Sequence, residues 1–209
     1  MKWRFGPMSA HNMIHLHCTK KLLAKLPLSD TGWLCNKRPS PYAANDVERE
    51  SLLSGWHANL IVLQRRQCLL FVHDATRFPL FIPALKKADL AELDYFFTDA
   101  FMNTLLKCGA DDALMNRAQA MLGPLVCDTN CDRSVLGTMN QLGQDIGWTL
   151  DGRGVNVNEI TGYGLGAAMA DRPCRVKNQK DCIWPQQAMF DLLKESGESH
   201  RDTTTQQPA

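Results

Sequence analysis

One segment near the middle of the chain combines residue types that can hold an anion. It runs from Asn130 to Asn140 and opens a stretch with the periodicity of an amphipathic helix. Its apolar residues recur every three or four positions and are expected to face the core: Val135, Met139, Leu142 and Ile146. The neighbouring face carries polar residues and a glycine at the same spacing: Arg133, Gly137, Asn140 and Gln144. A guanidinium and a carboxamide, with the glycine leaving a dent between them, could bind an anionic ligand or a docking partner.

Packing offers a second interpretation of this segment. Asp132 would cap the helix, Arg133 would lie in solvent, and Gly137 would allow a close contact between the helix and a sheet. A glycine inside a helix costs about 1 kcal/mol relative to alanine, so either packing or a ligand is needed to explain it. The sequence favours neither interpretation over the other.

A second cluster of cationic and hydroxyl groups follows the first expected strand. There, free backbone N–H groups at a helix N-terminus would attract phosphate or carboxylate, and lysines in a first turn have no local stability rationale. The alternative is a threonine cap followed by two solvated lysines. We expect the two segments to converge on one concave surface for a negatively charged ligand. The candidate ligand-binding residues are Thr19, Lys20, Lys21, Asn59, Arg133, Ser134 and Asn140.

Other functional patterns are weak. The segment 162–167 matches the G-x-G-x-x-[GA] pattern of dinucleotide sites, but the chain leaves little room for the rest of such a unit. Four cysteines are candidate zinc ligands, although the second spacing is wider than in common structural sites: Cys127, Cys131, Cys174 and Cys182. The histidines lack metalloprotease spacing and are interpreted as core or surface residues, and no G-x-S-x-G elbow occurs. We expect no metal and no cofactor, and we assign no catalytic residue.

The composition is that of an ordinary globular chain. With 209 residues, 44% hydrophobic and 22% charged, the chain is long enough for one core but short for two. Lys+Arg 23 against Asp+Glu 22 gives a formal charge of +1, so no overall field draws it to nucleic acid or to an anionic membrane. The sequence contains neither a signal-peptide core nor a membrane-spanning apolar run, so we expect a cytoplasmic protein whose eight cysteines are free thiols.

Turn signals and hydrophobic periodicity predict an α+β fold with a mainly antiparallel central sheet. Strands are expected near 14–18, 56–64, 68–73, 78–82 and, as a further candidate, 125–128. Helices are expected to cover the sheet near 20–26, 89–108, 111–122, 133–147 and 185–194. The glycine-rich segment 162–166 fits either a helix or a loop, and 155–160 fits either a strand or a polar helix. We expect an extension over 1–12, one domain over 13–195 and a disordered tail over 196–209.

Two motifs carry a resemblance to a known family. They are His17-Cys18-Thr19-Lys20-Lys21-Leu22 and Asp132-Arg133-Ser134-Val135-Leu136-Gly137-Thr138-Met139-Asn140, with Trp56 to Leu60 and Cys68 to Val72 between them. Together they resemble a bacterial family catalogued only as a domain of unknown function, over about Met13 to Leu193. The resemblance implies a compact, stand-alone bacterial protein and brings no established activity. This chain departs from the family in its N-terminal extension and in its glycine-rich segment 162–169.

Three functional hypotheses follow. The first is a non-enzymatic accessory protein that binds an anionic ligand or a macromolecular partner through Lys20, Lys21, Arg133 and Asn140. The second is an enzyme that acts on a phosphorylated or nucleotide substrate, in which Lys20 and Arg133 clamp the anion near Asp132 or Ser134. The third is nucleic-acid binding by three basic pairs: Lys20-Lys21, Arg65-Arg66 and Lys86-Lys87. A homodimer is compatible with each, and no membrane association is expected.

Overall fold

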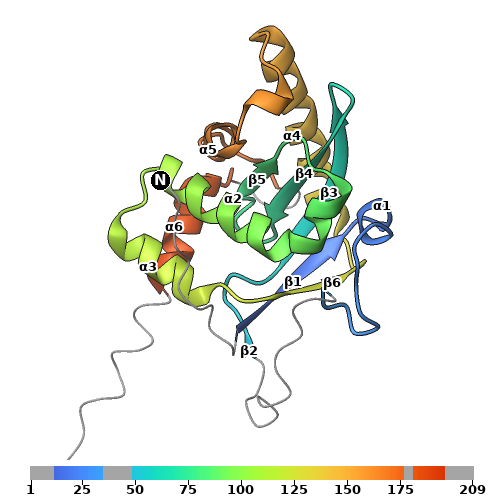
Figure 1. The fold of residues 1–209 in the computed structure, drawn as a ribbon. Helices are drawn as coiled ribbons and strands as arrows, with labels where there is room; N and C mark the ends of the chain where they lie inside the picture. The colour runs from blue at the N-terminus through green and yellow to red at the C-terminus, as the bar shows by residue number, and fades with distance from the viewer. Residues whose placement is uncertain (1–11, 35–48, 177–180, 196–209) are drawn as a thin grey trace, which may run out of the picture.

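The structure, a computed structural model, describes residues 12–34, 49–176 and 181–195. Its centre is a six-stranded sheet (Figure 1) built from β1 (Asn12–Cys18), β2 (Arg49–Glu50), β3 (Trp56–Leu63), β4 (Arg66–His73), β5 (Pro79–Ile82) and β6 (Leu125–Asp128). The helices are α1 (Lys20–Leu23), α2 (Leu93–Lys107), α3 (Asp112–Met121), α4 (Arg133–Gly152), α5 (Tyr163–Ala170) and α6 (Pro185–Glu195). Two 3-10 turns, η2 (Lys87–Glu92) and η3 (Val157–Glu159), complete the described elements. The predicted α+β class is confirmed.

The sheet is mixed, so the prediction of a mainly antiparallel sheet is only partly right. β3, β4 and β5 form the expected antiparallel meander. β1, however, pairs in parallel with β2, β3 and β6. Parallel neighbours need long crossover connections, and the chain between β1 and β3 and the helices between β5 and β6 supply them. The alternation of apolar residues that predicts a strand carries no information about its direction.

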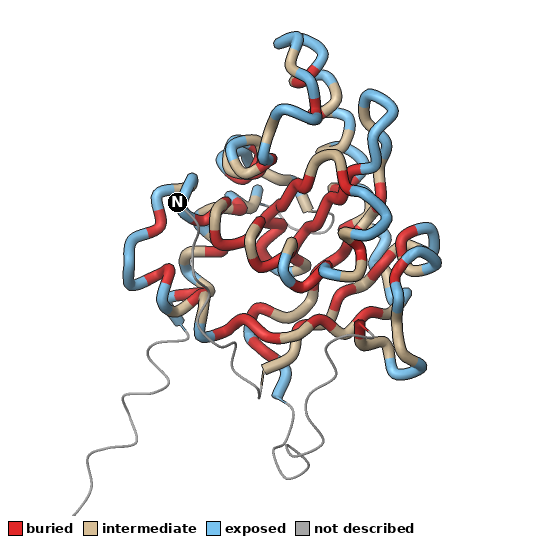
Figure 2. The backbone as a smooth tube through the Cα atoms, viewed as in Figure 1, coloured by how far each residue is buried: buried red, intermediate tan, exposed pale blue. Residues whose placement is uncertain are grey.

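Helices cover both faces of the central strands, as the continuous apolar runs predict. Leu69 and Phe71 point into a core that includes residues of α2, α3 and α6. Leu70 and Val72 point to the opposite face, where they pack with residues of α4 and α5. Figure 1 shows α2 across one face of the sheet, and Figure 2 shows that burial is concentrated in the central strands. No helix in the described ranges is long and apolar enough to cross a bilayer.

Several element boundaries differ from those predicted. The first helix is a single turn that ends at Leu23, and the expected helix 89–108 divides into η2 and α2. α4 continues to Gly152, five residues past its predicted end. Between the two alternatives for the glycine-rich segment, the structure has a helix, α5, and the segment 155–160 contains η3 rather than a strand. The expected N-terminal extension, apart from Asn12, and the expected tail lie outside the described residues.

Gly162 determines how α5 joins the sheet, and we predict a large effect when it is replaced. Its φ is +86°, and a Cβ there would lie 2.1 Å from the carbonyl oxygen of Phe81. Gly162→Ala should therefore lower the free energy of unfolding by more than about 1 kcal/mol in urea denaturation. Gly164 is the control, because a Cβ there meets nothing within 4 Å. Gly164→Ala should stabilise the protein slightly, and an equal response to both substitutions would contradict this role of Gly162.

Candidate functional site

The candidate site begins at Arg77, in the short connection between β4 and β5. Arg77 has a left-handed φ of 59°, and its backbone N–H donates to the carbonyl of His73. The strands on either side of it, β4 and β5, are buried on both faces. Arg77 is therefore buried as well, with 7% of the residue exposed. Nη2 donates a 3.4 Å hydrogen bond to Oγ of Ser134, whereas Nε and Nη1 are buried without a hydrogen-bond partner among the described residues. A buried guanidinium with one long hydrogen bond is an incomplete cation site.

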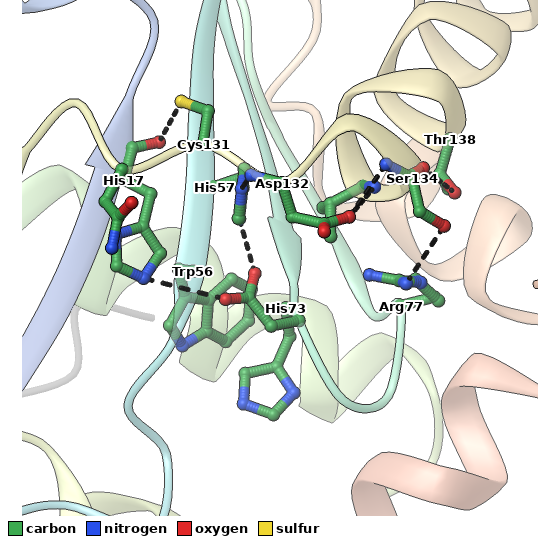
Figure 3. A network of polar contacts seen from close by, with 12 residues as sticks. His17, Trp56, His57, His73, Arg77, Cys131, Asp132, Ser134 and Thr138 are labelled. Atoms are coloured by element: carbon green, nitrogen blue, oxygen red, sulfur yellow. Dashed lines mark hydrogen bonds and ion pairs between the residues drawn. The ribbon is translucent and has the colours of Figure 1, made fainter.

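A cavity of about 460 Å³ opens beside this guanidinium, between the start of α4 and the segment after α5. We call it the arginine cavity. Its charged and hydroxyl-bearing lining residues include Arg77, Arg133, Ser134, Asp145, Arg172 and Arg175. Arg172 is partly engaged, since its Nη1 lies 3.5 Å from Oδ2 of Asp145. Figure 3 shows Arg77 reaching Ser134 at the start of α4. Four guanidinium groups against one carboxylate give the lining of this cavity a net positive charge.

The backbone at the start of α4 adds little to this charge. The side chain of Asp132 accepts hydrogen bonds from the N–H groups of Ser134 and Val135 at 2.7 and 3.1 Å. These backbone N–H groups of Val135 and Ser134 lower the pKa of the Asp132 carboxyl. The N-cap role of Asp132, which the packing interpretation predicts, is confirmed. The carboxylate of Asp132 thus lies at the positive N-terminal end of the α4 dipole, where a bound anion would otherwise lie. The backbone N–H groups of Ser134 and Val135 are therefore already satisfied within the protein.

We predict a pH-dependent contribution of Asp132 to stability. Asp132→Ala should cost about 0.5 to 1 kcal/mol at neutral pH, the lower part of the range for lost caps, because the carboxylate is exposed to solvent. Its folded pKa is lowered, so this contribution is complete above the ordinary carboxyl pKa and disappears as pH falls through the folded value. Thermal unfolding from pH 7 down to pH 2.5 measures the difference. Asp132→Asn keeps the cap and serves as control, and a pH-independent loss in the alanine variant would contradict the assignment.

A histidine connects the start of α4 to the sheet. His57 of β3 is 1% exposed, and its Nδ1 lies 2.5 Å from Oδ1 of Asp74, which follows β4. The backbone N–H of Asp132 donates to Nε2 of His57 at 2.6 Å. A backbone N–H can only donate, so Nε2 must be unprotonated and Nδ1 carries the proton that it donates to Asp74. His57 thereby holds the first residues of α4, including Ser134, in place beside Arg77.

A second histidine lies next to this pair at the end of β1. Nδ1 of His17 is 2.7 Å from Oδ1 of Asp128, and its Nε2 is 3.7 Å from Oδ2 of Asp74. The rings of His17 and His57 are 5.1 Å apart (Figure 3). Although partial burial raises the pKa of Asp128, hydrogen bonds from His17 and from the N–H of Asn130 bring it below its usual value. This cluster is a group of acids and bases beside the arginine cavity, but its histidines are not among the residues that line the cavity.

The structure places the predicted site residues in three separate locations: beside α1, in the arginine cavity and in a groove beside β3. Oγ1 of Thr19 donates to Oδ1 of Asn59 at 3.0 Å, instead of capping α1 as predicted. Lys20 and Lys21 are exposed on this one-turn helix, and they line neither the arginine cavity, nor the groove beside β3, nor the cavity between α4 and α5. A helix this short has almost no dipole to attract an anion.

Arg133 and Ser134 lie together in the arginine cavity, whereas Asn140 lines a groove beside β3. Arg133 and Asn140 share one side of α4, but seven residues correspond to about 10 Å along a helix axis. We expected Lys20, Lys21 and Arg133 to line one concave surface. The positions of these side chains do not support that expectation, because only Arg133 lines the arginine cavity. The alternative role of Gly137 as a close packing position also has none, since a Cβ there would meet nothing within 4 Å.

The cysteines proposed as zinc ligands lie in different surroundings. A hydrogen bond with Cys127, followed by burial, raises the pKa of the Cys18 thiol, and Cys131 lies close enough to add to this effect. The Sγ atom of Cys174 instead lies 3.9 Å from Oγ1 of Thr138, and both residues line the arginine cavity. No group of three or more His, Cys, Asp or Glu in the described chain is arranged to hold a metal ion. All cysteines in that part of the chain are free thiols.

Four residues of this region were not predicted from the sequence: Arg77, Asp74, Arg172 and Arg175. One signal for Arg77 is present, because it is the only cation in a short connection between two strands that are apolar on both faces. A side chain attached there has little access to solvent. Arg172 and Arg175 follow a segment that the sequence leaves ambiguous, and their proximity to α4 depends on how α5 packs.

A model for one protein family matches residues 15–188 of the chain, and its description is "Domain of unknown function (DUF6933)". Comparisons with curated proteins and with solved structures gave no significant match. The resemblance carried by the motifs at 17–22 and 132–140 agrees with this match, since both lie within it. The chain belongs to the family described as Domain of unknown function (DUF6933).

Proposed function

We propose that this bacterial protein is a non-enzymatic binding protein that recognises a small phosphate- or carboxylate-bearing ligand in the arginine cavity. The observation that carries the proposal is the lining of this cavity, in which four arginines, Arg77, Arg133, Arg172 and Arg175, stand against a single carboxylate, Asp145. Cations gathered in one cavity repel one another, and an anion bound among them removes that repulsion. The left-handed backbone of Arg77 adds a further cost for a residue other than glycine.

Size and charge support the same ligand class. A volume of about 460 Å³ is within the range of sites for small organic molecules. Planar guanidinium groups bind phosphate and carboxylate oxygens in pairs, and Ser134 and Thr138 supply hydroxyl groups on the adjoining helix turn.

A macromolecular partner has less support. The residues predicted for that role are divided between α1, the arginine cavity and the groove of Asn140. The three basic pairs proposed to contact nucleic acid lie on three different segments of the described chain: α1, the β3–β4 turn and the segment before α2. A cytoplasmic location and a homodimer are compatible with a small-ligand binding protein and are proposed with it.

An enzyme that acts on a phosphorylated substrate is the second candidate. It is favoured by the acids and bases beside the cavity, above all by His17, whose ring faces two carboxylates. For catalysis, a base must reach the proton that it removes, directly or through one water. His57 does not meet this requirement, because both of its nitrogens are already bonded within the protein.

Titration calorimetry with inorganic phosphate and pyrophosphate tests the proposal. Wild-type protein should bind, and the double substitution Arg133→Met with Arg175→Met should weaken binding at least tenfold, because it removes two of the four guanidinium groups. Arg65→Met with Arg66→Met is the matched control, since both are exposed arginines at the β3–β4 turn and neither lines the arginine cavity. Absence of binding to wild type, or equal loss in the control, would overturn the proposal. Release of phosphate from model phosphate esters would instead favour the enzyme.

A further inference from the structure

A second cavity adjoins the arginine cavity on the other side of Met169 and Arg172. Its volume is about 560 Å³, and it lies between the end of α4, the segment after it and α5. The apolar residues that line it are Leu150, Val155, Ile160, Leu165, Ala168 and Met169. We call it the apolar cavity. Both cavities share Met169 and Arg172 in their walls, so they lie side by side and a ligand in one is next to the other.

We infer that the ligand of this protein is an amphiphilic anion, whose charged group lies in the arginine cavity and whose hydrocarbon part lies in the apolar cavity. The inference rests on the proposed function and specifies its ligand. That ligand is an organic phosphate or carboxylate with an aliphatic portion. A purely inorganic anion would leave the larger of the two cavities unused.

The wall between the cavities is suited to such a ligand. Met169 is 2% exposed and is an unbranched, adaptable side chain that can line a hydrocarbon chain without a fixed shape. The side chain of Arg172 is 54% exposed, and its contact with Asp145 is 3.5 Å, so this ion pair is solvated and easily exchanged. A ligand anion can take the place of Asp145 as partner of Arg172. Arg172 would then cover the point where the hydrocarbon part leaves the arginine cavity.

The charges at the rim of the apolar cavity agree with an anion that enters past them. Lys107, Arg153 and Arg172 line it together with a single acid, Glu159. The three cations therefore outnumber the acid along the path of entry. Apart from Thr149, Thr161 and two glycines, the remaining wall is aliphatic. It favours a flexible or branched hydrocarbon over a stacked aromatic base, because no aromatic ring lines this cavity in the described residues.

Titration calorimetry with a homologous series tests the inference: inorganic phosphate, ethyl phosphate, butyl phosphate and hexyl phosphate. Affinity should rise with chain length by roughly three- to fourfold for each methylene that becomes buried. Ala168→Trp should fill the apolar cavity from α5, where Ala168 is exposed and a larger side chain need not disturb the core. This variant should abolish the dependence on chain length and leave the affinity for inorganic phosphate unchanged.

The outcomes separate the two proposals. If inorganic phosphate binds and its alkyl esters bind no more tightly, the inference is wrong and the proposed function stands. If none of the series binds, the proposed function fails as well. If the gain with chain length persists in Ala168→Trp, the hydrocarbon lies elsewhere and the inference is overturned. Unchanged phosphate binding by the variant shows in the same experiment that it is folded.

Discussion

Arg77→Met is expected to abolish stabilisation by pyrophosphate without weakening the ligand-free protein. An anion present at 100 times its Kd adds about 2.7 kcal/mol to the free energy of unfolding, which corresponds to a rise in Tm of roughly 5 to 10 °C for a chain of this size. In Arg77→Met this rise should be lost, because the buried cation that faces Ser134 is gone. The ligand-free variant should be as stable as wild type or more stable by about 1 to 2 kcal/mol, since an incompletely paired buried charge is removed.

Arg65→Met is the matched control for this experiment. Arg65 also has a left-handed backbone, with a φ of 63° against 59° for Arg77, but its side chain is exposed at the β3–β4 turn. The two substitutions therefore remove the same charge from the same backbone conformation. The control should keep the full rise in Tm with pyrophosphate. A large loss of ligand-free stability in Arg77→Met together with an intact pyrophosphate response would show that Arg77 has a purely structural role.

Acidification from pH 7 to pH 4 is expected to destabilise the protein by about 3 kcal/mol through His73 alone. Burial lowers the pKa of His73 to about 4 from an ordinary value of 6.5. Its Nδ1 accepts from the hydroxyl and the backbone N–H of Thr76, which leaves Nε2 as the donor to the carbonyl of Ser54. Protonation of His73 would place a hydrogen on Nδ1, where it would face the hydroxyl and N–H donors of Thr76 and break these hydrogen bonds. The magnitude follows because lowering a pKa by one is equivalent to about 1.36 kcal/mol.

The sign follows from the number of protons bound in each state. Between pH 6.5 and 4 the unfolded chain carries a proton on His73 and the folded chain does not, so acid favours unfolding. Urea denaturation at pH 7, 6, 5 and 4 measures this dependence. His73→Asn keeps an acceptor near Thr76 and should remove the decline over this range. His15→Asn leaves His73 in place and should retain it, and identical pH profiles for wild type and His73→Asn would contradict the assignment.

Local patterns were sufficient to predict most of the elements. The apolar runs of β3 and β4 are continuous, and the helical spacing from Val135 onward is regular, so both were found from the sequence with small errors at their ends. The direction of β1 was not predicted, because parallel pairing with β3 and β6 is a non-local property. α5 was ambiguous since three glycines lie in or beside it, and only its packing against β5 and α2 decides in favour of a helix.

The candidate site was predicted in part for the same reason. Arg133 and Ser134 belong to a conspicuous motif and do line the arginine cavity. Asn140 belongs to the same motif, but the helix carries it two turns further, to a different groove. Lys20 and Lys21 attracted attention through their charge, yet charge alone does not place a side chain in a concavity. Arg77 was missed because a single arginine in a short turn has no local pattern, and its importance appears only with its burial.

The most direct test of an anion site in the arginine cavity is a crystal structure of the full chain soaked in selenate at low chloride, with data collected at the selenium absorption edge. We expect an anomalous peak within hydrogen-bonding distance of the side chains of Ser134 and Arg133, on the side of the cavity that Arg77 approaches. A crystal that shows selenate beside Lys20 and Lys21 with an empty arginine cavity, or no ordered selenate at all, would contradict the account.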